Sequence, residues 1–345
     1  MIRFYRLFFV LLIFVLVASE VFGQGGQDRA GTTAAPELRI PVGGRYLAMG
    51  GSPVASATGL EAIYWNPAGV YLTDINASAI FSYRQYIADM GMNYVAVSGN
   101  FGSLGTLALS FRNLDIGDIN VTTLDQPDGT GEIINPAYFI LGLTYSRQLS
   151  DRISVGATMN LIDESWANVG ASGFSFDVGV QYRDLFISGL AIGVVVKNLG
   201  GTMQYDGSDL FVQAAQDDDR GNTFYKITAG KFELPSEISL GVSYTRQINA
   251  DNLISVSGSF TNNNFTYDDY KIGVEYSYGN ILFVRGGYLF SPNSSDETPN
   301  IFEDYSLGFG LNTKGFSGFD ISVDYAYVPV KYFDANNTFS IRVNF

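Results

Sequence analysis

The sequence contains no cysteine and no histidine in its 345 residues. Without cysteine there is no disulfide to hold the fold and no thiolate for catalysis. Without histidine the chain lacks the usual proton shuttle near neutral pH, the two-histidine zinc motif and the His-dependent catalytic triads. These two absences argue against an enzyme, so we predict no catalytic residues, no cofactor and no metal site.

Charged residues are also scarce, at 16% against about a quarter in ordinary soluble domains. Those present are mostly acidic, giving a formal net charge of −14. Such an acidic surface disfavours nucleic acid and anionic lipid as partners. Aromatic residues are abundant instead, with 22 Tyr and 26 Phe, and there are 39 Gly. Tyr and Phe are suited to the interface between a membrane and water.

Long apolar runs are missing except at the N-terminus. Arg3 and Arg6 precede an apolar stretch over residues 7–18, and small residues follow at the positions that a signal peptidase inspects. This pattern predicts a signal peptide over residues 1–23, cleaved between Gly23 and Gln24. The stretch is too short to span a membrane comfortably, and no later one approaches about eighteen apolar residues. We therefore expect an exported protein with no transmembrane helix after cleavage.

After residue 76 the sequence divides into alternating apolar and polar segments of roughly ten residues, separated by turn residues, as expected for tilted strands that cross a membrane. The pattern predicts an all-β fold: a transmembrane antiparallel β-barrel of about fourteen strands over residues 77–345. The expected strands lie near 77–86, 92–101, 104–112, 137–148, 152–163, 172–183, 187–198, 235–247, 252–263, 267–279, 281–291, 303–313, 317–328 and 336–345.

The connections and the last strand favour a barrel over a soluble β-sandwich. Short links such as Gly102-Ser103 alternate with long ones such as 199–234, which is typical of short periplasmic turns and long external loops. The segment Thr338–Phe345 alternates without a break and ends on Phe345, the aromatic that outer-membrane assembly machinery is expected to read. Alternation alone would also fit a sandwich, whose apolar face packs on a second sheet. The predicted location is the bacterial outer membrane, with its lipid as a partner.

Charged residues on the predicted inward face indicate a lumen that holds water or a packed plug. For each of them, pairing across neighbouring strands is the simpler interpretation, so none is assigned a substrate. They are Arg147, Asp177, Lys197, Lys271, Glu275, Arg285, Asp320, Asp324 and Arg342.

Residues 24–76 form an N-terminal extension that does not alternate. Thr58, with Glu61 three residues later, predicts a capping box for a short helix, which Pro67 would end. Gly50 and Gly51 allow a sharp turn before that helix. A unit of under about thirty residues is too small to fold alone, so we expect it to pack inside the barrel.

Two parts of this extension resemble a known family. The pairing of Ala48-Met49-Gly50-Gly51 with Tyr64-Trp65-Asn66-Pro67-Ala68-Gly69 is similar to the N-terminal motif of PorV/PorQ outer-membrane proteins. That family in turn resembles the FadL-type long-chain fatty-acid transporters, which share an Asn-Pro-Ala hatch and a fourteen-stranded barrel. The resemblance implies a hatch, or plug, at about residues 40–72. Its expected residues are Gly50, Gly51, Trp65, Asn66, Pro67, Ala68 and Gly69.

The resemblance leaves three functions open. PorV-type members serve the type IX secretion system of Bacteroidota-like bacteria, which implies a translocon and cargo proteins as partners. FadL-type members move hydrophobic small molecules through a lateral opening, and the glycine-containing stretch Leu104–Leu107 permits a kink of that kind. A passive structural barrel or adhesin is the third. Aromatic-bearing loop segments, Leu210–Val212 and Phe224–Tyr225, favour the secretion accessory because exposed apolar side chains engage partner proteins.

Overall fold

The computed structural model describes residues 29–71, 75–215, 222–292, 302, 304–316 and 319–345. The predicted signal peptide and the cleavage residues Gly23 and Gln24 lie outside these ranges. Among the described residues, no helix has both the length and the apolar character needed to cross a membrane.

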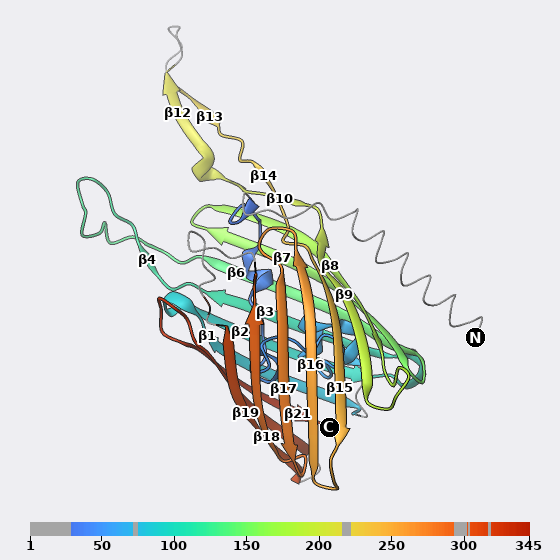
Figure 1. Cartoon of the computed structure of the whole chain (residues 1–345). Coiled ribbons are helices and arrows are strands. Elements are labelled where there is room, and N and C mark those ends of the chain that lie inside the picture. Colours follow the sequence, from blue (N-terminus) through green and yellow to red (C-terminus); the bar gives the residue numbers. More distant parts are fainter. Residues whose placement is uncertain (1–28, 72–74, 216–221, 293–301, 303, 317–318) are drawn as a thin grey trace.

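Fourteen antiparallel strands of the described chain form one closed wall (Figure 1). Each pairs with its neighbours in sequence order, and the first strand pairs with the last, so the sheet has no free edge. The predicted fourteen-stranded barrel is therefore confirmed. The strands are β1 (Ala77–Gln85), β2 (Gly91–Asn100), β3 (Thr106–Asp115), β6 (Ala137–Ser150), β7 (Ile153–Trp166), β8 (Val169–Tyr182), β9 (Leu190–Gly200), β15 (Glu237–Gln247), β16 (Asn252–Asn263), β17 (Asp269–Tyr278), β18 (Leu282–Phe290), β19 (Tyr305–Phe316), β20 (Phe319–Val328) and β21 (Asn336–Asn344).

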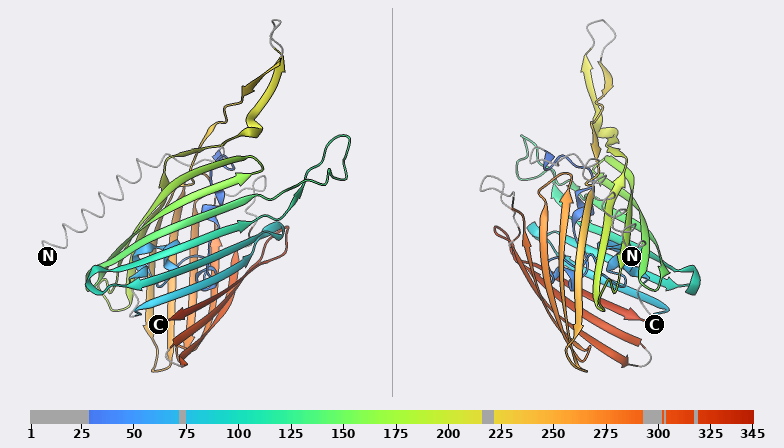
Figure 2. Two further views of the ribbon diagram at one scale, coloured as in Figure 1. Left: turned by 180° about the vertical axis from the view of Figure 1, so that it is seen from behind. Right: turned by 45° about the vertical axis from the view of Figure 1, so that its right-hand side comes forward.

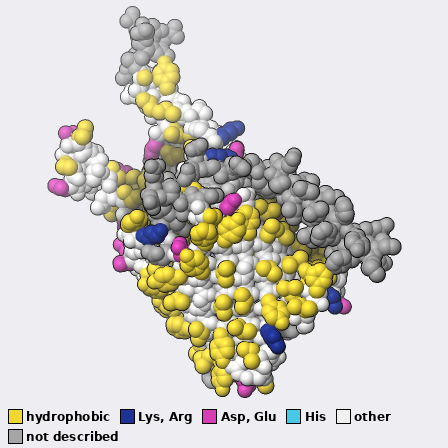
Figure 3. Space-filling view, in the orientation of Figure 1, with side chains coloured by type: hydrophobic (Ala, Val, Ile, Leu, Met, Phe, Trp, Pro, Cys, Tyr) yellow, Lys and Arg dark blue, Asp and Glu magenta, His cyan; other side chains and the backbone are white. Residues whose placement is uncertain are grey.

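The outer face of the wall is apolar and the inner face is small or polar. On β15, for example, Leu240, Val242 and Tyr244 point outward, whereas Ser239 and Ser243 are buried inside. Figure 3 shows hydrophobic side chains spread over the visible wall. One predicted facing is wrong: Arg147 is exposed and lies on the outer face, in phase with Tyr145, at the end of β6 where the strand leaves the apolar band.

The two ends of the barrel differ. Residues 151–152, 248–251 and 279–281 make tight turns at one end, which we call the turn end. The described parts of the long connections 116–136, 201–236 and 291–304 lie at the other, the loop end. Two of the long connections contain hairpins that sequence patterning did not predict, β4–β5 (Ile119–Asn120, Ile133–Ile134) and β12–β13 (Phe211–Ala215, Asn222–Lys226). Both project beyond the wall (Figure 2).

Residues 29–71 run through the lumen from the loop end to the turn end (Figure 1). A strap, residues 29–40, starts near the long connections, where the Ala34 amide donates to the Glu233 carbonyl at 2.9 Å. A lumen segment, residues 41–70, follows and is largely buried. It leads to Tyr71, whose amide donates to Ser146 Oγ at 3.2 Å near the turn end.

Four short helices shape these residues: η2 (Pro36–Arg39), α2 (Gly44–Leu47), α3 (Ala62–Trp65) and η3 (Pro67–Val70). Asn66 is extended, with φ −165°, because the following proline excludes helical geometry there, and Pro67 then starts η3. The predicted capping box is wrong. Thr58 donates its amide to the Tyr46 hydroxyl, and Glu61 accepts the amide of Arg45, so neither side chain caps α3.

A charge on the outer wall should oppose insertion. Val242 lies at the middle of β15 and is 48% exposed toward the lipid face. We expect Val242→Arg to cost roughly 2–4 kcal/mol and to reduce the folded barrel in outer-membrane fractions. Thr245→Arg, which points into the lumen on the same strand, should insert well. Equal recovery of the two variants, measured by heat-modifiable gel mobility, would contradict the assigned facing.

Candidate functional site

A belt of glycines lines the inner wall where the lumen segment touches it. At each position a Cβ would lie within 3.0 Å of an atom already present. In most cases that atom belongs to the lumen segment. Three cross-strand pairs, Gly156–Gly179, Gly193–Gly241 and Gly273–Gly287, place two such glycines side by side. The glycine belt comprises Gly156, Gly179, Gly193, Gly241, Gly273, Gly287 and Gly308. Because these positions lack side chains, the backbone of the lumen segment approaches the sheet directly.

Asn66 occupies a notch in this belt and is fully buried. Its Oδ1 accepts the Ala68 amide at 3.1 Å and lies where a side chain at Gly179 would be. Its Nδ2 donates to the Val54 carbonyl at 3.0 Å and reaches the Val180 carbonyl of β8 at 3.3 Å. One amide group therefore joins two turns of the lumen segment to the wall.

The other predicted hatch residues are brought together around Asn66. Pro67 and Ala68 form the start of η3, and Gly69 lies so close to the Ala57 carbonyl that no side chain would fit. At the opposite side Gly50 and Gly51 both have positive φ, 65° and 70°, and the amide of Gly50 donates to Ser306 Oγ at 3.0 Å. Phe345, the predicted assembly residue, is distant from this cluster and stacks edge-on against Phe319 on the outer wall.

Trp65 is the apolar centre of the lumen segment. It is 7% exposed, and its ring meets those of Tyr64 and Tyr46 edge-on, with centroids 5.0 and 6.5 Å apart. Gly51 lies against the indole, where a Cβ would collide with it.

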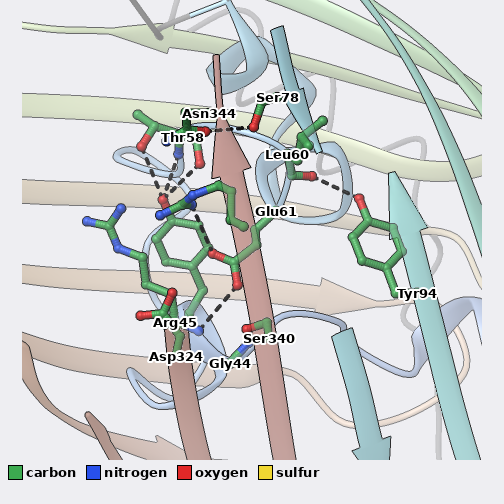
Figure 4. A network of polar contacts seen from close by, with 12 residues as sticks. Gly44, Arg45, Thr58, Leu60, Glu61, Ser78, Tyr94, Asp324, Ser340 and Asn344 are labelled. Atoms are coloured by element: carbon green, nitrogen blue, oxygen red, sulfur yellow. Dashed lines mark hydrogen bonds and ion pairs between the residues drawn. The ribbon is translucent and has the colours of Figure 1, made fainter. Parts of the chain in front are cut away.

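Buried ion pairs tie the lumen segment to β17–β21. The Arg45 guanidinium binds Glu275 with two hydrogen bonds of 2.9 and 3.1 Å. Arg285 bridges Glu275 and Asp324, and the Gly44 amide donates to Ser340 Oγ at 2.9 Å. Glu61 lies beside Arg45 and 3.8 Å from Arg342 (Figure 4). These charges are compensated inside the lumen, so four of the predicted inward residues have structural partners.

Above the lumen segment, at the loop end, lies a cavity of about 480 Å³. Gly50, Gly51, Val54 and Trp65 form its floor. Side chains from β1, β9, β15–β20 and the loop-end connections form its wall. No group of three or more acidic side chains in the described part of the chain could hold a metal ion.

The kink that the stretch Leu104–Leu107 would permit is not present in β3. β3 pairs continuously with β2 and with β6 over its whole length. The ladder shifts instead between β8 and β9, where Asp177 Oδ1 accepts the amide of Asn198, a residue with φ 58°. Asn198 also donates from its side chain to the Pro235 carbonyl at 2.9 Å. The segment Val196–Gly200 thus marks an irregular place in the wall.

Two buried carboxyl groups lie where the strap packs against the wall beside Leu38. Glu37 on η2 and Glu164 on β7 are each 1% exposed, and Tyr205 donates a hydrogen bond to Glu164. Burial and the neighbouring Glu164 raise the pKa of Glu37 from 4.5 to about 8, although Arg112 on β3 opposes this shift. Tyr138 and Tyr205 also face the pair. Glu37 therefore remains a neutral acid at pH 7.

Because the folded pKa of Glu37 is raised, anchoring of the strap should be strongest below pH 4.5 and weaken as the pH rises toward about 8. Hydrogen exchange of the Ala34 amide, corrected for the intrinsic pH dependence, should show protection falling by up to about tenfold per pH unit within this window. Glu37→Gln should remove that dependence. An identical pH profile in both proteins would rule out Glu37 as the titrating group.

The glycine belt supplies a matched pair of substitutions on one strand. A Cβ at Gly287 would strike the backbone of Met49 and Gly50, whereas a Cβ at Gly286 would make only an ordinary contact with Leu307. We expect Gly287→Ala to displace the lumen segment at a cost of about 1–3 kcal/mol while the wall stays folded. Single-channel recordings should then show conductance that the Gly286→Ala control lacks. Indistinguishable traces from the two variants would mean that this contact does not seal the lumen.

The closed fourteen-stranded wall and the internal segment define the class: an outer-membrane β-barrel with the FadL-type fold. Three solved structures share that fold. The CymD monoaromatic hydrocarbon channel matches with a TM-score of 0.54 and 14% identity, covering 88% of this chain and 97% of its own. The Pseudomonas putida toluene transporter TodX gives 0.54 and 12%, covering 87% and 96%. A Pseudomonas aeruginosa FadL homologue gives 0.54 and 11%, covering 92% and 99%.

The family is established by sequence. The family model for "Type IX secretion system protein PorV" matches residues 24–212, more than half of the chain, so this protein belongs to the PorV family. No curated protein matches the chain by sequence. Neither this family nor the solved neighbours are described as enzymes.

Proposed function

We propose that this protein is a non-enzymatic accessory barrel of type IX secretion, which engages the translocon or its cargo at the loop end. The observation that carries this proposal is the PorV family match, which includes the lumen segment and the first half of the wall. The proposal further assigns the lumen segment the role of a hatch. Its residues Gly50, Gly51, Trp65, Asn66, Pro67, Ala68 and Gly69 would keep the pore closed while partner proteins bind outside it.

Two features support the hatch. Backbone contacts at the glycine belt and the ion pairs of Arg45 and Glu275 fasten the lumen segment to strands on several sides of the barrel. A barrel used as a docking platform needs such a seal, because an open pore would leak solutes whenever the partner is absent.

The β12–β13 hairpin is the surface that suits a protein partner. Phe211, Val212, Phe224 and Tyr225 are between 45% and 68% exposed on it. The hairpin projects beyond the wall at the loop end (Figure 2), so these side chains are not part of the lipid-facing band. Exposed aromatic side chains outside the membrane commonly become the buried anchors of an interface.

Transport of hydrophobic small molecules is the second candidate, and the loop-end cavity favours it. Trp65 and Tyr64 give this cavity an apolar part beneath its opening, as a transporter needs. The continuous ladder of β3 speaks against a lateral exit at that strand.

A double substitution on the hairpin separates the two candidates. Phe211→Ser with Phe224→Ser removes two aromatic anchors from a surface that the barrel fold does not need. Recovery of a very large translocon barrel and of cargo with the tagged protein should fall by at least about tenfold. Leu124→Ser is the control, because Leu124 is fully exposed on a different loop-end connection, 116–136. If neither partner is recovered with the parent protein and uptake of an apolar dye depends on it instead, the transporter is the correct function.

A further inference from the structure

Arg84 is a buried cation with no carboxylate partner in the described part of the chain. It lies on the inner face of β1 near the loop end and is 3% exposed. Its guanidinium offers five N–H donors. One hydrogen bond is made, from Nη1 to the Pro41 carbonyl at 3.2 Å, and the group lies 5.1 Å from the centre of the Tyr86 ring. Nε is buried and has no partner among the described residues.

The lack of a carboxylate partner sets Arg84 apart from most other cations of the lumen. Arg45, Arg285, Lys197, Lys271 and Arg342 each lie within 4.0 Å of a carboxylate. Arg112, which also lacks an ion pair within the described chain, lies over the Tyr64 ring at 5.5 Å and does not line the cavity. Arg84 does line it. An unpaired charge out of water is costly, so an anion placed beside Arg84 would be bound favourably.

The cavity beside Arg84 has the charge and shape for such an anion. Its lining carries four cationic side chains and three acidic ones, namely Arg39, Arg84, Lys197 and Lys271 with Glu237, Asp269 and Asp304. Lys197 and Lys271 are each paired with one of these acids. The cavity lining therefore has a net charge of +1, although the whole chain carries −14.

Aromatic rings complete the lining. Tyr86 and Phe302 lie next to each other with centroids 6.1 Å apart, and Tyr64 and Trp65 meet edge-on at the floor. Flat apolar groups pack well on such rings, and a cavity of about 480 Å³ has room for a molecule of one or two rings.

We propose that the loop-end cavity is a binding site for a small organic carboxylate with a flat apolar body, and that Arg84 is the anchor of its carboxylate. The planar guanidinium presents N–H groups in pairs that match the two oxygens of a carboxylate. The apolar body lies against Tyr86, Phe302 and Trp65. The ligand comes from the loop end because the lumen segment closes the floor.

The chain itself provides the reporter for a test. Its two tryptophans are Trp65, which lines the cavity, and Trp166, which is 42% exposed at the end of β7. In a Trp166→Phe background the fluorescence of the purified full-length barrel reports on Trp65 alone. Phenylacetate and 2-phenylethanol are water-soluble probes that share a ring and a chain length and differ in charge.

We expect saturable quenching by phenylacetate and at least tenfold weaker binding of 2-phenylethanol. Arg84→Gln should weaken phenylacetate binding by about tenfold or more and leave 2-phenylethanol unchanged, while Arg84→Lys should retain part of the preference. Arg152→Gln, exposed in a turn at the other end, is the control. Acetate and inorganic phosphate, which lack the apolar body, should compete poorly.

Equal affinity of the parent protein for phenylacetate and 2-phenylethanol would overturn the proposal, as would an unchanged preference in Arg84→Gln. The comparison of the two probes in the parent protein decides the matter even if the variant does not fold. None of these measurements depends on secretion, so their outcome is separable from the role of the hairpin.

Discussion

The close approach of the lumen segment to the inner wall is the contact on which the rest of this structure depends. Seven inward positions on β7, β8, β9, β15, β17, β18 and β19 carry no side chain, and backbone and side-chain atoms of residues 48–67 occupy the space. Asn66 and Arg45 then fix that backbone with directed polar bonds. The cavity and its aromatic floor both follow from this contact, because each is built on the segment that it holds.

The wall could be predicted from the sequence because its physical rule is local. Lipid outside and a polar lumen inside impose a period of two on every strand, and turn residues mark where strands end. The contacts inside the lumen were harder to predict, because they join residues that lie far apart in the sequence. Glycine on a strand also suits the curvature of a barrel, so its presence alone does not reveal a contact. Gly179 faces the side chain of Asn66 and Gly287 faces the backbone of Met49 and Gly50, in both cases more than a hundred residues away in sequence. Thr58 and Glu61 have the spacing of a capping box, yet the buried Tyr46 hydroxyl and the Arg45 amide offer them stronger partners. The sequence does carry a signal for the contact between the wall and the lumen segment. Neighbouring strands have a glycine on the inward face at a similar level along the barrel axis.

Charged side chains are arranged differently on the surface and inside the lumen. The acidic excess lies largely on surfaces that water screens. Inside the lumen, apart from Arg84 and Arg112, the cations are matched to individual carboxylates at short distance. These ion pairs fix the position of the lumen segment relative to the wall, because a shifted segment would leave buried charges unpaired. The family of the protein and its fold neighbours share the barrel, but function differs among such barrels through the residues placed inside and at the loop end.

The path of residues 29–71 makes the protein a threaded ring. The strap lies at the loop end, Tyr71 lies at the turn end, and the wall that encircles them is closed by the pairing of β1 with β21. The chain continues from this segment into the wall at the turn end, whereas the strap is held at the other mouth by noncovalent contacts. The segment can therefore be withdrawn only through the loop end, strap first, and not sideways through the closed wall.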